Sequence, residues 1–245
     1  MRQGLFITVE GGEGVGKSTF VRLLRDRIMT AAGTAMEIVQ TREPGGTPVA
    51  NSIRAIFASP PDTEPLTPEA EAMLVMAARA QHVAHLIRPA LRRGAIVLCD
   101  RYADSMMVYQ GVVGGVDRAW LESTNRVASK GLEPDITFLL DCPVEVSTRR
   151  SSLRNKGLNK VRDKDVKVDD GIQRYDDSTT AQHEKIRAGF LDCARRAPGR
   201  FVVLDATRAP EYVVADALAV LSSRASHVFQ TRPHENDPGK SGGAR

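Results

Sequence analysis

The sequence predicts an α/β fold in which a parallel sheet of five strands lies between layers of helices. Short runs of apolar residues alternate along the chain with longer stretches of helical periodicity, which is the order of elements typical of parallel α/β proteins. The apolar runs also lack alternating polar residues, as expected of strands that helices cover on both faces. A chain of 245 residues, 42% of them hydrophobic, can bury such a core in one domain.

The predicted strands are residues 5–9, 36–40, 95–99, 136–140 and 201–204. Residues 17–31 have helical periodicity and end near Gly33, since glycine often follows the last helical turn. A longer helix should begin after Thr67, whose hydroxyl can cap it, with Pro68 in the first position. We expect it to end at Gly94, with a kink near Pro89 because proline lacks a backbone N–H.

One domain is expected over residues 1–225. Inside it, the stretch from 155 to 177 is polar and nearly free of large apolar side chains, which favours a lid of about residues 150–178 that can close over a ligand. Residues 226–245 are rich in glycine, proline and charge. We expect this tail to be disordered because it has too little apolar surface to bury.

The positive charge gathers in one segment. The net charge is +4, yet nine of the 34 basic residues and only four of the 30 acidic ones lie between Arg149 and Arg174. A nucleic-acid-binding protein usually has a wider basic face, whereas a compact cluster suits a triphosphate, so nucleic acid is not an expected partner. No apolar run could span a bilayer, the N-terminus does not resemble an export signal, and the three cysteines form no C-x-x-C pair. We therefore expect a cytoplasmic protein with reduced thiols and no membrane partner.

The strongest motif is Gly11-Gly12-Glu13-Gly14-Val15-Gly16-Lys17-Ser18. It matches the phosphate-binding loop (P-loop) G-x-x-x-x-G-K-[ST], between a predicted strand and a predicted helix. Its glycines let backbone N–H groups turn toward a phosphate, and the helix N-terminus favours the negative charge. Lys17 should reach the β- and γ-phosphates, and the Ser18 hydroxyl should bind Mg²⁺. The alternative is a glycine-rich turn that binds nothing. The predicted fold class is therefore a three-layer P-loop NTPase fold.

Two further polar segments follow predicted strands. Asp100-Arg101 comes after the third strand and Thr41-Arg42-Glu43-Pro44-Gly45-Gly46-Thr47 after the second. Ligands of open α/β sheets bind at this carboxyl edge. Asp100 could hold Mg²⁺ and Arg101 could clamp a phosphate with two N–H groups. A structural Asp–Arg ion pair and a plain turn are the competing interpretations. The N-K-x-D element of a GTPase is absent from the sequence.

With these residues in place, the chain resembles thymidylate kinases of the bacterial type from about Leu5 to Leu221. The motifs that carry the resemblance are Val9-Glu10-Gly11 with the P-loop, the Glu-Pro-Gly-Gly loop, Ala77-Ala78-Arg79-Ala80-Gln81-His82, Asp100-Arg101-Tyr102, Tyr109-Gln110-Gly111 and Gln182-His183-Glu184-Lys185-Ile186-Arg187. The resemblance implies transfer of a phosphoryl group from ATP to dTMP with Mg²⁺, in a homodimer.

The resemblance also implies roles by position. The ATP-binding residues are Gly11, Gly12, Glu13, Gly14, Val15, Gly16, Lys17, Ser18, Thr19, Arg149 and Arg174. The dTMP-binding residues are Glu13 near the 3′-hydroxyl, Arg42, Pro44, Arg79 at the thymine O4 edge, Arg101 on the phosphate, and Ser105, Tyr109 and Gln110 beside the base. Catalysis is implied for Lys17, Arg101, Arg150 and Arg154, and Mg²⁺ binding for Ser18 and Asp100. A solvated surface residue is the simpler interpretation of Arg79, and helix packing that of Tyr109.

The sequence departs from the family pattern where the acceptor base should lie. Val75 replaces an aromatic residue that stacks on thymine, Val112-Val113-Gly114-Gly115 replaces a glycine-rich turn with an arginine, and the lid is longer. Stacking on a base contributes about 1–3 kcal/mol. A kinase for dUMP or a modified deoxyuridylate, a family member that turns over slowly, and an ATP-dependent regulator or nucleic-acid-binding P-loop protein therefore remain alternatives.

Overall fold

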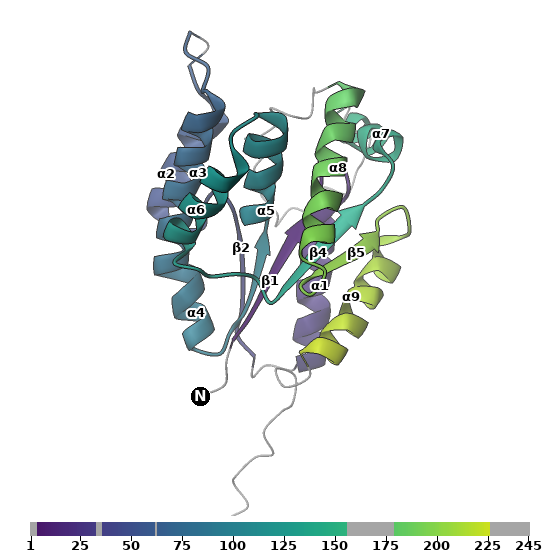
Figure 1. Ribbon diagram of the computed structural model, residues 1–245. Helices are drawn as coiled ribbons and strands as arrows, with labels where there is room; N and C mark the ends of the chain where they lie inside the picture. The colour runs from purple at the N-terminus through teal and green to yellow at the C-terminus, as the bar shows by residue number, and fades with distance from the viewer. Residues whose placement is uncertain (1–3, 33–35, 62, 156–178, 226–245) are drawn as a thin grey trace, which may run out of the picture.

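The computed structural model describes residues 4–32, 36–61, 63–155 and 179–225 (Figure 1). Its centre is a sheet of five strands in the order β2-β3-β1-β4-β5, and every neighbouring pair is parallel. The strands are β1 (Leu5–Glu10), β2 (Ile38–Arg42), β3 (Ile96–Asp100), β4 (Ile136–Asp141) and β5 (Phe201–Asp205). The predicted five-stranded parallel sheet is thus confirmed.

Side chains from successive strand residues enter different layers. In β1, Leu5, Ile7 and Val9 belong to the core shared with helices α1 and α9, whereas Phe6 packs in a second core on the opposite face. Residues of α1 (Lys17–Ala32) and α9 (Pro210–Arg224) complete the first core. Because residues along a strand alternate between faces, continuous apolar runs feed two cores, and the three-layer arrangement follows.

The prediction that all strands are buried on both faces holds for the three inner strands only. All residues of β1 are buried, but β2 is partly exposed along its length, and Val203 in β5 is 50% exposed. These two strands form the edges of the sheet, where each has one neighbouring strand. The predicted second strand was also wrong by two residues, since β2 begins at Ile38 rather than Met36.

The long predicted helix begins as expected and is then interrupted. Helix α3 (Pro68–His82) starts after Thr67, whose hydroxyl accepts the N–H of Ala70. A turn of π-helix, η1 (Val83–Ile87), and the short α4 (Arg88–Arg92) continue the run, and Gly94 ends it with φ of 83°. Wider π-type turns accommodate an extra residue and are frequent at functional sites.

The remaining helices lie beside the carboxyl end of the sheet or cover one face (Figure 1). They are α2 (Pro48–Ala58), α5 (Ala103–Met106), the π-helix η2 (Met107–Val113), α6 (Arg118–Ser129), α7 (Val144–Asn155) and α8 (Thr180–Arg196). Arg174, most of the expected lid and the tail from residue 226 lie outside the described residues. Within the described part of the chain, no helix is long and apolar enough to cross a membrane.

Candidate functional site

The P-loop joins β1 to α1 in a conformation that requires glycine. Gly11, Gly14 and Gly16 have φ of 139°, 73° and 99°, a region that side chains with a Cβ rarely adopt. At Gly14 an added Cβ would collide with the carbonyl oxygen of Ser147 in α7. The glycines therefore let the loop pass beneath α7 and lead to the N-terminus of α1. A helix N-terminus favours a bound phosphate.

Lys17 lies over this loop. Its Nζ donates to the carbonyl oxygens of Gly11 and Gly12, at 3.1 and 2.5 Å. Burial and the nearby Arg101 charge lower the pKa of Lys17 to about 8, although Glu13 and Asp100 oppose the shift. The ammonium group is thus held where it could pass from two carbonyl oxygens to phosphate oxygens. Ser18 and Thr19 are exposed in the first turn of α1, and Val15 is buried beneath it.

Arg101 follows β3 and is held by four groups. Its φ of 66° lies in the left-handed region, which is uncommon for a residue other than glycine. One guanidinium nitrogen donates to the Gly11 carbonyl oxygen at 3.0 Å and to Ser105 Oγ at 3.1 Å. The other donates to Glu13 Oε1 at 2.9 Å, and the guanidinium carbon lies 5.1 Å from the centre of the Tyr109 ring. These contacts fix the orientation of the cation.

Glu13 extends from the P-loop toward the same cation. Its Oε1 accepts from Arg101 and from the Tyr109 hydroxyl at 2.6 Å, while its Oε2 is buried without a hydrogen-bond partner. Burial alone would raise the Glu13 pKa, but the charges of Arg101 and Lys17 and the Tyr109 hydrogen bond hold it below its ordinary value. The carboxylate thus keeps one oxygen available for a donor. The Tyr109 ring also packs edge to face on Phe190, so this residue has both the predicted packing role and a polar contact with Glu13.

Glu10 is a site residue that the sequence analysis missed. It ends β1 and is fully buried, with Oε1 accepting the N–H of Tyr102 at 2.8 Å and Oε2 accepting from Ser105 Oγ at 2.6 Å. Burial and the nearby Asp104 raise its pKa to about 7. Glu10 therefore holds the backbone of Tyr102, which follows Arg101, and the Ser105 hydroxyl that Arg101 contacts. Through these two contacts it helps to position the arginine. The sequence did contain a signal for it, namely a glutamate directly after the apolar run of residues 5–9.

Asp100 ends β3 beside the P-loop strand. Its Oδ1 is buried and has no hydrogen-bond partner, and β3 pairs with β1 so that Asp100 lies opposite Val9. Among the described residues, no group of three or more His, Cys, Asp or Glu side chains could hold a metal ion. Mg²⁺ usually takes one or two protein oxygens and completes its shell with phosphates and water. Asp100 Oδ1 and the Ser18 hydroxyl could supply such oxygens.

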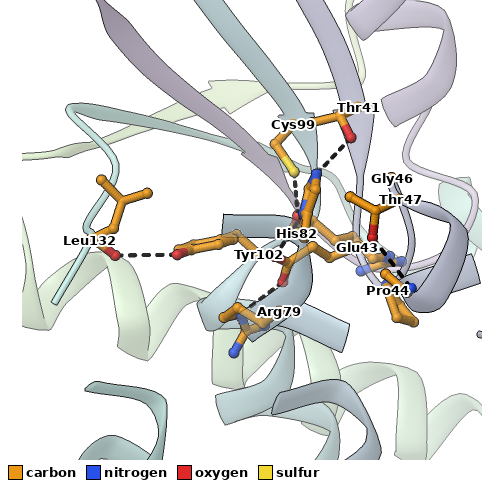
Figure 2. A network of polar contacts seen from close by, with 12 residues as sticks. Thr41, Glu43, Pro44, Gly46, Thr47, Arg79, His82, Cys99, Tyr102 and Leu132 are labelled. Atoms are coloured by element: carbon orange, nitrogen blue, oxygen red, sulfur yellow. Dashed lines mark hydrogen bonds and ion pairs between the residues drawn. The ribbon is translucent and has the colours of Figure 1, made fainter. Parts of the chain in front are cut away.

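A proline and a glycine shape the loop after β2 (Figure 2). The Glu43–Pro44 peptide is cis, and Gly46 has φ of 88°. Arg54 of α2 donates to the Pro44 carbonyl oxygen at 2.9 Å, and Thr47 caps α2 by accepting the N–H of Ala50. Pro44 is buried, and Arg42 is partly exposed at the end of β2. The loop is therefore anchored at both of its ends.

Arg79 is buried in α3 rather than solvated on its surface. Only 1% of it is exposed. Its Nε donates to Glu43 Oε2 at 2.7 Å and one terminal nitrogen to Asn125 Oδ1 at 2.8 Å, while the other, Nη2, is buried without a partner. The neighbouring Val75 is also buried, in a core cluster with methionines of α3, α5 and η2. Gln110, predicted beside the base, donates to the buried Glu71 at 3.0 Å.

The described arginines of the expected lid lie on α7. Arg149 and Arg154 are exposed on α7, and Arg150 donates to the Ala206 carbonyl oxygen, beyond β5, at 2.8 Å. The structure thus brings together the P-loop, Arg101, Glu13, Ser105 and Tyr109. Of the arginines on α7, Arg150 is held instead by the segment after β5.

A parallel sheet with a P-loop after its central strand β1, and polar segments after β3 and β2 on one side of that strand, defines a P-loop nucleotide-binding protein. Residues 9–217 match the family model described as thymidylate kinase. The chain is 42% identical to a thymidylate kinase of Chromohalobacter salexigens, over 91% of this chain and 98% of that one. It is 46% identical to a thymidylate kinase of Thermomicrobium roseum, over 87% and 91% of the two chains. The crystal structure of a thymidylate kinase from Ehrlichia chaffeensis superposes with a TM-score of 0.68 at 26% identity, over 89% of this chain and 99% of that one. The chain belongs to the thymidylate kinase family.

Proposed function

We propose that this protein transfers the γ-phosphoryl group of ATP to dTMP, giving ADP and dTDP for dTTP synthesis. One observation carries the proposal beyond family membership. Lys17 and Arg101, the cations expected on the donor and acceptor phosphates, both donate to the Gly11 carbonyl oxygen, at 3.1 and 3.0 Å. Two cations this close repel each other, and phosphate oxygens between them would relieve that repulsion.

In the proposed reaction, an oxygen of the dTMP phosphate attacks the γ-phosphorus while ADP leaves on the opposite side. Lys17 and the P-loop amides hold the donor phosphates, and Arg101 holds the attacking phosphate. Glu13 Oε2, which is buried without a partner, accepts the 3′-hydroxyl of the acceptor. Catalysis of this kind depends on positioning and on charge already in place, without a covalent enzyme intermediate.

The remaining residues have proposed roles around these two cations. Ser105, Tyr109, Gln110, Arg42 and Pro44 form the walls of the acceptor site. Arg149 and Arg174 are proposed to bind ATP, and Arg150 or Arg154 to contact its transferring phosphate. Since Arg150 is bonded to Ala206 here, that role requires it to exchange this carbonyl oxygen for a phosphate. Mg²⁺, held by Asp100 and Ser18, would neutralise charge on the β- and γ-phosphates.

The test is a coupled ADP-release assay with ATP and Mg²⁺ and one acceptor at a time: dTMP, dUMP, 5-hydroxymethyl-dUMP, dCMP or none. We expect strong turnover with dTMP, and loss of activity in EDTA that returns when Mg²⁺ is added. Preference for another pyrimidine acceptor would keep the reaction and change the substrate. ADP release that is independent of acceptor would contradict the proposal.

We further propose that the chain forms a homodimer through helices α2, α3 and α6. Seven large hydrophobic side chains are exposed among the described residues, and four of them, Val49, Ile56, Met73 and Val127, lie on these helices. Helix α3 packs against both α2 and α6. Exposed apolar side chains that gather on adjacent elements mark interaction surfaces.

Light scattering after size-exclusion chromatography should give about twice the chain mass of 26.7 kDa. Replacing Met73 by glutamate should shift the protein to monomer, because a buried unpaired charge is costly at such a surface. Met29 in α1 is equally exposed, at 54% against 57%, and Met29→Glu should leave the dimer intact. A wild-type protein of 26.7 kDa would contradict the proposal.

The location that we propose is the cytoplasm. The three cysteines, Cys99, Cys142 and Cys193, are buried free thiols, which suits a reducing compartment.

A further inference from the structure

The Arg79 guanidinium is unusual in having all but one of its nitrogens committed to the protein. Its Nε contacts Glu43 at 2.7 Å, and Nη1 contacts Asn125 Oδ1 at 2.8 Å and Met106 Sδ at 3.6 Å. The guanidinium carbon lies 4.9 Å from the centre of the Tyr102 ring. Contacts from four residues in three segments therefore fix both the position and the plane of the group, and Nη2 is the one nitrogen left for a ligand.

A buried donor without a partner is costly unless a ligand supplies an acceptor. Arg79 Nη2 therefore has an N–H group available for an acceptor that a ligand supplies. A guanidinium can present a single nitrogen accurately only if its other nitrogens are restrained, because the arginine side chain has several rotatable bonds. The residues that restrain it decide where the free N–H groups point.

Glu43 is the main restraint, and it is held in turn by His82 (Figure 2). Glu43 is 4% exposed and His82 is fully buried. Since a carboxylate has no proton to give, His82 Nδ1 donates to Glu43 Oε1, at 3.0 Å. This contact leaves Glu43 Oε2 for Arg79. The two oxygens of one carboxylate thus serve two partners from successive turns of α3.

His82 also ties this carboxylate to the loop after β2. Its Nε2 lies 2.7 Å from Thr41 Oγ1, and a Cβ at Gly46 would lie 2.5 Å from the same Nε2. The imidazole therefore touches the loop before and after the cis Glu43–Pro44 peptide. One chain of contacts therefore links the loop, Glu43 and Arg79.

We propose that Glu43, oriented by His82, is a positioning residue that aims Arg79 Nη2 at a carbonyl oxygen of the acceptor base. This inference rests on the proposed function, since it assumes a nucleotide with a base carbonyl in the acceptor site. It makes the loop after β2 a structural part of base recognition. Neither Glu43 nor His82 needs to touch the reacting phosphates.

The experiment measures dissociation constants for dTMP and, separately, for ATP by titration calorimetry, together with KM and kcat. Glu43→Gln keeps the size of the side chain and removes its charge. We expect its Kd and KM for dTMP to rise at least about tenfold, as for loss of a hydrogen bond between charged groups, while its Kd for ATP stays within about twofold. The matched control is Glu37→Gln, because Glu37 lies before β2 and pairs with Arg93 at the exposed surface. We expect the control to bind dTMP as the wild type does.

Two substitutions of His82 separate positioning from packing. His82→Asn retains a donor at the place of Nδ1 and should bind dTMP within about threefold of the wild type, whereas His82→Leu lacks that donor and should resemble Glu43→Gln. This pair also carries the test if Glu43→Gln does not fold. Unchanged dTMP affinity in Glu43→Gln and His82→Leu would overturn the inference, and so would an equal loss of ATP affinity. A wild-type protein without activity on any pyrimidine acceptor would instead overturn the proposed function.

Discussion

Replacing Arg101 by alanine should lower kcat/KM for dTMP by about a thousandfold, the scale of an arginine that clamps a transferring phosphate. The guanidinium is oriented by Gly11, Ser105 and Glu13, so little ordering remains for the moment of reaction. The loss should appear in steady-state kinetics as both a higher KM for dTMP and a lower kcat.

Arg101→Lys is the informative companion to this variant. It keeps the charge but cannot reach Ser105 and Glu13 with separate nitrogens, and we expect it to recover only a small part of the activity. ATP binding and thermal stability should be measured alongside, because loss of Arg101 leaves Glu13 with fewer partners. Activity of either variant within tenfold of the wild type would show that Arg101 does not clamp the acceptor.

Replacing Lys17 by methionine should lower kcat by about a hundredfold to a thousandfold, as for removal of one preorganised donor from a charged transition state. Methionine keeps an unbranched chain of similar length but has no ammonium group for the β- and γ-phosphates. In the structure that group contacts the Gly11 and Gly12 carbonyl oxygens. The matched control is Lys185→Met, since Lys185 is exposed on α8.

The pH dependence of ATP binding provides a second readout for Lys17. The pKa of Lys17 is lowered to about 8, so its side chain is cationic below that pH and increasingly neutral above it. The ratio of wild-type to Lys17→Met affinity for ATP should therefore be largest below pH 8 and should shrink as the pH rises. A ratio that is constant from pH 6 to pH 9 and close to one would contradict this role, whereas a large constant ratio would contradict only the lowered pKa.

Several parts of the molecule could be predicted because their signals are local. The P-loop was recognisable because phosphate binding needs glycines, a lysine and a hydroxyl residue at fixed spacing. The start of α3 was predicted because Thr67 and Pro68 act within one helical turn. Strand positions were correct to within two residues because apolar runs report burial, yet β2 and β5 showed that such runs do not report which strands form the edges.

Arg79 marks the limit of this local reasoning. In the sequence it is an arginine inside an amphipathic helix, and a place in solvent is the simpler interpretation. In the fold it is buried against Glu43 from a loop 36 residues earlier and Asn125 from a helix 46 residues later. No spacing rule links these three positions, so the sequence offered no sign of their contact.

The sequence by itself determined the fold class, the donor-phosphate loop and, through its motifs, the family. Each depends on neighbouring residues or on the period of a strand or helix. Only the tertiary structure decided that Glu10 supports Arg101, that Glu43 and His82 restrain Arg79, and that Lys17 and Arg101 meet at one carbonyl oxygen. Those contacts arise because parallel strands bring their carboxyl ends to one edge of the sheet, whatever their distance along the chain.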